Sequence, residues 1–133
     1  MEVFWDTSGL VATLLKEPGT SDALRAWGQT SRVWCWRWLQ VEMEAALSRR
    51  SAPGAAWAQW RKLSGTIDWL DFDRAQYPAL CAFNRPLRLR AADAGHLFVC
   101  DRAASTLPSL HLYTQDKEMA VAANTLGLSL LAP

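Results

Sequence analysis

The chain has 133 residues, of which half are hydrophobic and a fifth are charged, and its net charge is +1. This length and composition predict a single globular domain over residues 1–133. A net charge this close to zero gives no overall basicity typical of nucleic-acid-binding proteins, and it neither supports nor excludes an RNA substrate. No apolar stretch approaches the ~20 residues of a transmembrane helix. Residues 1–3 lack the basic and apolar regions of a signal peptide, which predicts a cytoplasmic protein without a membrane segment.

The sequence contains three cysteines, an odd number without the paired spacing of a metal site: Cys35, Cys81 and Cys100. These predict reduced thiols of a cytoplasmic protein that serve as small core residues. Eight tryptophans are many for this length. We expect most of them in the core or at an interface with a partner, because exposed aromatic side chains in such number promote association.

Apolar runs and helical patterns alternate along the chain. In chain order they predict a strand at residues 3–5, helices at 9–15 and 20–27, a strand at 32–36, helices at 37–50 and 55–63, a strand at 67–72, helices at 74–83 and 88–100, a strand at 110–114, a helix at 116–126 and a strand at 128–131. Thr7 or Ser8 is expected to cap the first helix, and residues 84–86 are expected to turn the chain. Strands that alternate with helices predict an α/β fold with a mostly parallel sheet.

Four carboxylates, at Asp6, Glu42, Asp93 and Asp116, can reach one edge of such a sheet. Asp6 and Asp116 follow the first and fourth predicted strands, where α/β proteins bind ligands, and the other two lie within predicted helices. Gathered carboxylates repel one another unless a divalent cation compensates them, so the set is a candidate Mg²⁺ or Mn²⁺ site. Taken singly, Asp6 and Asp116 are equally candidate N-caps, and Glu42 a solvated helix residue, whereas an unpaired acid in mid-helix at Asp93 favours a function.

Four segments in this order resemble the PIN domain, and most closely the small PIN proteins that act as toxins of VapBC-type toxin–antitoxin pairs. They are residues 6–11 (Asp-Thr-Ser-Gly-Leu-Val), 41–47 (Val-Glu-Met-Glu-Ala-Ala-Leu), 89–97 (Leu-Arg-Ala-Ala-Asp-Ala-Gly-His-Leu) and 114–119 (Thr-Gln-Asp-Lys-Glu-Met). The resemblance implies a three-layer α/β/α sandwich whose mostly parallel central sheet has 4–5 strands.

The resemblance also implies a metal-dependent endoribonuclease that uses Mg²⁺ or Mn²⁺, with an RNA substrate, a cognate antitoxin protein and a homodimeric assembly. Its catalytic and metal-binding residues would be Asp6, Glu42, Asp93 and Asp116, with Thr114 in support. A metal-activated water would then attack the RNA phosphodiester, so no serine, cysteine or histidine nucleophile is required.

Two features depart from the family pattern. Residues 36–40 (Trp-Arg-Trp-Leu-Gln) precede Glu42 where the family usually has a small hydroxyl residue, and Glu44 is a second acid close to Glu42. These departures keep open the alternative of a catalytically silent PIN-like binding or scaffolding module, and of Glu44 in place of Glu42. His96, three positions after Asp93, is expected to be a packed or hydrogen-bonded residue rather than a metal ligand.

Overall fold

In the computed structural model, which describes residues 1–132, five strands form one parallel sheet in the order β3-β2-β1-β4-β5. The strands are β1 (Glu2–Trp5), β2 (Arg32–Trp36), β3 (Asp68–Leu70), β4 (His111–Tyr113) and β5 (Ser129–Leu130). The helices are α1 (Thr7–Leu14), α2 (Thr20–Gly28), α3 (Trp38–Arg49), α4 (Gly54–Ser64), α5 (Tyr77–Leu87), α6 (Ala91–Ala104) and α7 (Lys117–Thr125), with a 3₁₀ turn at Arg74–Gln76. None of these helices is long and apolar enough to cross a membrane.

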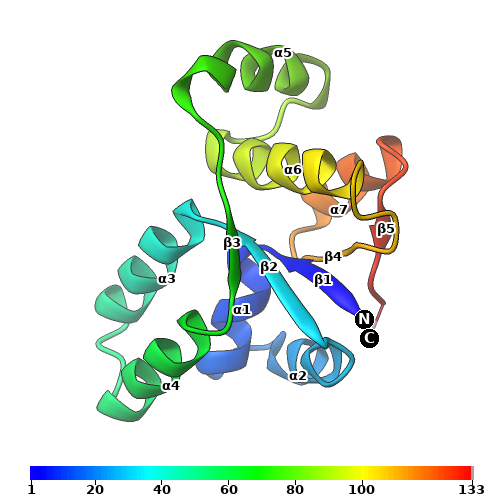
Figure 1. The fold of residues 1–133 in the computed structure, drawn as a ribbon. Coiled ribbons are helices and arrows are strands. Elements are labelled where there is room, and N and C mark those ends of the chain that lie inside the picture. The colour runs from blue at the N-terminus through cyan, green and yellow to red at the C-terminus, as the bar shows by residue number, and fades with distance from the viewer. Residues whose placement is uncertain (133) are drawn as a thin grey trace.

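The sheet is the middle of three layers (Figure 1). Helices α1 to α4 cover one face, and α6 and α7 cover the other, with α5 packed on α6. The predicted three-layer α/β/α sandwich with a parallel sheet is therefore confirmed.

Alternate side chains of the central strand β1 enter two separate cores. Val3 and Trp5 pack among buried residues of α1 to α4, whereas Phe4 packs among those of α6 and α7. Successive strand residues point to opposite faces, so a strand that is buried on both faces has no polar alternation. This explains why residues 3–5 read as one continuous apolar run.

The predicted helix boundaries around α5 and α6 are wrong. Residues 84–86 do not turn the chain, because α5 continues through Pro86 to Leu87. The turn comes at Arg88, which has a left-handed backbone (φ 58°), and α6 begins only at Ala91. The Asn84 side chain fixes this turn, since it donates to the Leu89 carbonyl (2.8 Å) and accepts from the Leu89 amide (2.9 Å).

Two smaller expectations also need correction. Thr7 and Ser8 do not cap the first helix; its N-cap is Asp6, the other candidate, whose carboxylate accepts from the Gly9 amide. Of the three free cysteines, two are buried as expected, but Cys81 is exposed on α5.

Candidate active site

Asp6 lies directly after β1 and is almost completely buried, with 3% of its surface exposed. Its Oδ1 accepts hydrogen bonds from the Ser8 hydroxyl (2.8 Å) and the Gly9 amide (3.1 Å), and its Oδ2 accepts one from the Thr114 hydroxyl (2.6 Å). Burial raises the pKa of Asp6, although these hydrogen bonds and the charge of His96 oppose the rise. Three donors therefore hold one buried carboxylate in a fixed orientation.

Thr114 connects this carboxylate to the next strand end. Besides donating to Asp6, its hydroxyl oxygen accepts from the Asp116 amide (3.0 Å). Asp116 is the N-cap of α7, where its carboxylate accepts from the Met119 amide (3.1 Å). The carboxyl ends of β1 and β4, and the N-termini of α1 and α7, are thus joined by one short network.

Glu42 reaches the same region from α3. Its Oε1 accepts from the Thr7 hydroxyl (2.8 Å) and lies 2.5 Å from Nε2 of His96. Burial raises the pKa of Glu42, but the hydrogen bond and the charge of His96, with the bond from Thr7, outweigh it and lower the pKa. Glu44 lies elsewhere, since its carboxylate accepts from the Trp60 indole on α4 (3.4 Å). Of the two acids, only Glu42 faces the other predicted site residues.

The sequence predicted the burial of His96 but not its contact with Glu42. It is 2% exposed, as expected for a packed residue, yet its Nε2 contacts Glu42 and lies 3.3 Å from the Thr7 hydroxyl. Within residues 1–132 its Nδ1 has no hydrogen-bond partner, so the ring interacts with Glu42 through Nε2, which donates to the carboxylate. The available signal was its position one helical turn after Asp93, which puts both on one face of α6.

Asp93 lies in the first turn of α6 and not in mid-helix as the sequence suggested. A carboxylate there is stabilised by the positive end of the helix dipole. In the described part of the chain it accepts no hydrogen bond. Burial raises the pKa of Asp93, and the negative charges of Asp116, Asp6 and Glu42 raise it further, against the charge of His96. Asp93 therefore lies close enough to the other three predicted carboxylates for their charges to act on it.

The donor chemistry of this cluster fits a hard divalent cation, because carboxylate oxygens are the ligands that such ions prefer. As the side chains stand, however, no group of three or more His, Cys, Asp or Glu residues among residues 1–132 is arranged to hold a metal ion. Glu42 is turned toward Thr7 and His96, and Asp6 toward Thr114. Binding an ion through these residues would require side-chain rotation.

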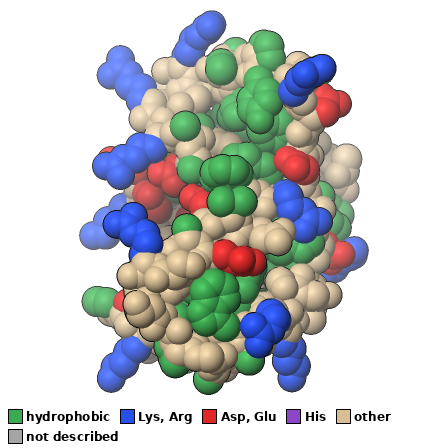
Figure 2. Space-filling model, turned by 90° about the vertical axis from the view of Figure 1, so that its left-hand side faces the viewer, with side chains coloured by type: hydrophobic (Ala, Val, Ile, Leu, Met, Phe, Trp, Pro, Cys, Tyr) green, Lys and Arg blue, Asp and Glu red, His purple; other side chains and the backbone are tan. Residues whose placement is uncertain are grey.

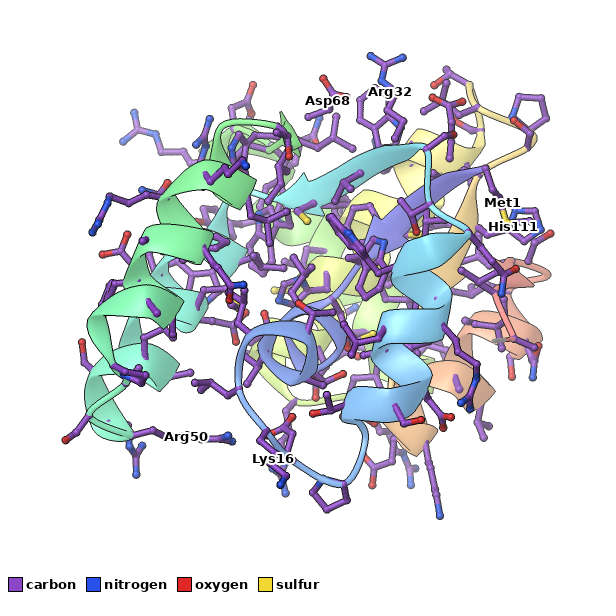
Figure 3. All side chains as sticks on the ribbon, turned by 90° about the horizontal axis from the view of Figure 1, so that it is seen from below. Met1, Lys16, Arg32, Arg50, Asp68 and His111 are labelled. Atoms are coloured by element: carbon purple, nitrogen blue, oxygen red, sulfur yellow. The ribbon has the colours of Figure 1, made fainter. Side chains whose placement is uncertain are left out.

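A groove of about 650 Å³ opens beside Glu42, lined by Thr7, Glu42, Ala45, Ala46, Arg49 and Arg50. Arg49 lies two helical turns after Glu42, on the same side of α3. Arg50 points from the end of α3 toward the segment that carries Lys16 (Figure 3), where it pairs with Glu17 (2.8 Å). The alanines keep the groove open, and Arg49 supplies positive charge next to the acids.

Comparisons with known proteins agree with this architecture. No family model matches the sequence. The chain is 30% identical over 134 residues to Ribonuclease VapC35 from two strains of Mycobacterium tuberculosis, CDC 1551 / Oshkosh and ATCC 25618 / H37Rv, and the match covers 98% of this chain and 96% of the relative.

Among solved structures, VapC20 of Mycobacterium tuberculosis, a sarcin-ricin loop cleaving toxin, matches with a TM-score of 0.74 and 20% identity, over 99% of this chain and 100% of that one. PAE2754 from Pyrobaculum aerophilum matches with a TM-score of 0.61 and 19% identity, over 92% of this chain and 79% of that one. At these identities the two structures establish the fold, and the relationship to VapC35 establishes the family. The chain belongs to the VapC family of PIN-domain toxin ribonucleases.

Proposed function

We propose that the protein is the toxin of a type II toxin–antitoxin pair and that it acts as an Mg²⁺- or Mn²⁺-dependent endoribonuclease. The observation that carries this proposal is that four carboxylates from four segments gather at the carboxyl edge of the sheet, where Thr114 bonds both the Asp6 carboxylate and the Asp116 amide. Burial and the nearby charges of the other three acids raise the pKa of Asp93. Charges gathered in this way destabilise the fold unless a cation or a positively charged ligand compensates them. Membership of the VapC family supports ribonuclease activity, and VapC20, which cleaves the sarcin-ricin loop, favours a structured RNA as the substrate.

In this proposal Asp6, Asp93 and Asp116 would hold the cation, with Glu42 as the fourth acid beside them. A bound divalent cation lowers the pKa of a coordinated water and neutralises charge on the phosphodiester. Thr114 keeps the Asp6 carboxylate oriented, and Thr7 and His96 hold Glu42 close to the site.

The proposed partners follow from the family. A toxin of this kind requires an antitoxin that blocks the acidic cluster, and a basic side chain of that antitoxin would compensate the same charges as a cation. A homodimer remains part of the proposal. Gel filtration of the toxin alone, and of the toxin co-expressed with the protein encoded beside its gene, tests both assemblies.

The central test compares two carboxylates of α6. Asp93→Asn should lower the rate of RNA cleavage by about 100-fold or more, because it removes a ligand charge while keeping the shape of the side chain. Asp101→Asn is the matched control, since Asp101 lies two turns further along the same helix and, among residues 1–132, takes no part in the hydrogen bonds of the site. Equal cleavage by both variants would remove Asp93 from the mechanism.

One observation favours the alternative of a catalytically silent PIN-like module: within residues 1–132 no metal-binding group is assembled, and Glu42 is already bound to Thr7 and His96. Calorimetric titration with MnCl₂ separates the two functions without an activity assay. Binding that Asp93→Asn weakens and Asp101→Asn leaves unchanged supports the nuclease. No binding at millimolar metal, together with no RNA cleavage, supports the silent module.

A further inference from the structure

An aromatic cleft of about 520 Å³ lies next to the acidic cluster. Its walls include Trp36 at the end of β2, Trp38 at the start of α3, Phe72 after β3, Tyr77 at the start of α5, and Ala91 and Ala92 in the first turn of α6. The next residue of α6 is Asp93, so one turn of helix borders both the cleft and the acids. A pocket of this size is typical of small-ligand sites.

One wall of the cleft is rigid. The Trp36 ring stacks on Phe72 (centroids 5.7 Å apart, 18° between planes) and meets the edge of His96 (5.0 Å, 88°). Its indole Nε1–H donates to Asp71 (3.2 Å). The ring also lies directly against the backbone of Gly95, where any Cβ would clash with it. A ring that is held on so many sides offers a preformed surface for stacking, and little conformational entropy is lost when a ligand binds to it.

The opposite side of the cleft is open to solvent. Trp38 is 46% exposed and Tyr77 is 56% exposed, and the Trp38 ring lies 6.4 Å from that of Trp36. On the face drawn in Figure 2, hydrophobic side chains run down the middle, acidic side chains gather at the left, and Lys and Arg side chains lie around the rim. Exposed aromatic side chains that adjoin one another mark a binding surface.

The lining is mostly apolar and aromatic, which favours a flat ring, and its polar groups include the Tyr77 hydroxyl and the Cys81 thiol. Asn84 is the one amide of the lining, and both of its polar atoms are already bonded to the Leu89 backbone. Aromatic rings bind any of the four bases by stacking, because every base has a π face. Arg90 precedes the cleft residues Ala91 and Ala92, is exposed, and forms no ion pair among residues 1–132, so it can meet a phosphate. Arg37 is already engaged, since its guanidinium lies over the Trp69 ring (4.7 Å) and donates to Gln40.

We propose that the aromatic cleft holds one unpaired nucleobase of the RNA substrate, stacked against Trp36 and Trp38, beside the phosphodiester that reaches the acids. This inference rests on the proposed ribonuclease function. It predicts that the substrate is an RNA with an unpaired nucleotide at the cleavage site, in a loop or a bulge, and that this nucleotide is accepted with little preference for the base.

Binding without cleavage tests the inference separately from the function. The full chain carrying Asp93→Asn, in EDTA, is titrated by fluorescence anisotropy with a labelled single-stranded RNA, with the same RNA as a duplex, and with a backbone of matched length that lacks bases. We expect the single strand to bind more tightly than the other two. Adding Trp38→Ala should weaken single-strand binding roughly 5- to 100-fold, and Trp38→Phe should retain most of it.

Val41→Ala is the matched control, since Val41 is 51% exposed one turn further along α3. Equal affinity of the Trp38→Ala and Val41→Ala proteins for the single strand overturns the inference. So does a result in which the protein without either substitution does not bind the single strand measurably, or binds it no more tightly than the backbone that lacks bases. If Trp38→Ala leaves the RNA affinity unchanged but converts a dimer to a monomer in sedimentation, the inference is overturned and the cleft is assigned to self-association. Intact stacking with no cleavage by the wild type would refute the proposed function alone.

Discussion

Gly95→Ala should destabilise the protein even though alanine is the better helix former. A Cβ on Gly95 would lie 2.3 and 2.4 Å from two carbons of the Trp36 ring, well inside van der Waals contact. Trp36 cannot move away easily, because Asp71, Phe72 and His96 hold it. Alanine gains about 1 kcal/mol of helix propensity, whereas overpacking against a fixed ring costs about 3 kcal/mol. The free energy of unfolding should therefore fall by about 2 kcal/mol.

Urea unfolding followed by circular dichroism measures this change, with Gly28→Ala as the control. Gly28 is also helical, but nothing lies within 4 Å of its Cβ position, so alanine there should stabilise by about 0.5 kcal/mol. In a Trp36→Ala background the clash is gone, and Gly95→Ala should become neutral or stabilising. An equal loss of stability in both backgrounds, or a gain in the wild type, would refute the reasoning.

Three further predictions concern stability and thiol chemistry. Thr114→Val removes a 2.6 Å hydrogen bond to the buried Asp6 carboxylate and should lower the free energy of unfolding by about 2 kcal/mol in urea titrations. Arg88→Gly should raise it by about 1 kcal/mol, because Arg88 has a left-handed backbone that glycine adopts without strain. Cys81 should be the one thiol that an aromatic disulfide reagent modifies in the native chain, because it is exposed whereas the other two are buried.

Each of these has a matched control. Thr125→Val removes an exposed hydroxyl bonded to its own helix, so a loss as large as that of Thr114→Val would mean that Asp6 is not the cause. Arg85→Gly, in the last turn of α5 where the backbone is still helical, should destabilise by up to about 1 kcal/mol, and the same sign for Arg88→Gly would contradict the backbone argument. Burial raises the pKa of the Cys35 and Cys100 thiols, so rapid labelling of either in the native state would contradict their placement.

The sequence predicted the sheet because each strand carries its own signal. The run at residues 32–36 has the bounds of β2, and Gly127, the residue after the last predicted helix, has the positive φ (76°) of a glycine that follows a helix end. The boundaries around α5 were missed because Pro86 predicts a break, whereas the side chain of Asn84 determines where the chain turns. Helix propensity depends on residue type and near neighbours, so it does not include the hydrogen bonds between the Asn84 side chain and the Leu89 backbone.

Only part of the candidate site could be predicted from the sequence. The acids could be named from their order along the chain and from the family resemblance, and their role as metal ligands stays a prediction. The bond between Glu42 and His96, and the support of Trp36 by Gly95, join distant segments and became visible only in the folded structure. The departure at residues 36–40, which first favoured a silent module, supplies two walls of the aromatic cleft.

The position of β1 also has a consequence for synthesis of the protein. The middle strand of the sheet, β1, is made well before β4, with which it pairs. Asp6 receives its bond from Thr114 only after that pairing. The acidic edge of the sheet therefore cannot assemble during synthesis until β4 and Thr114 have left the ribosome.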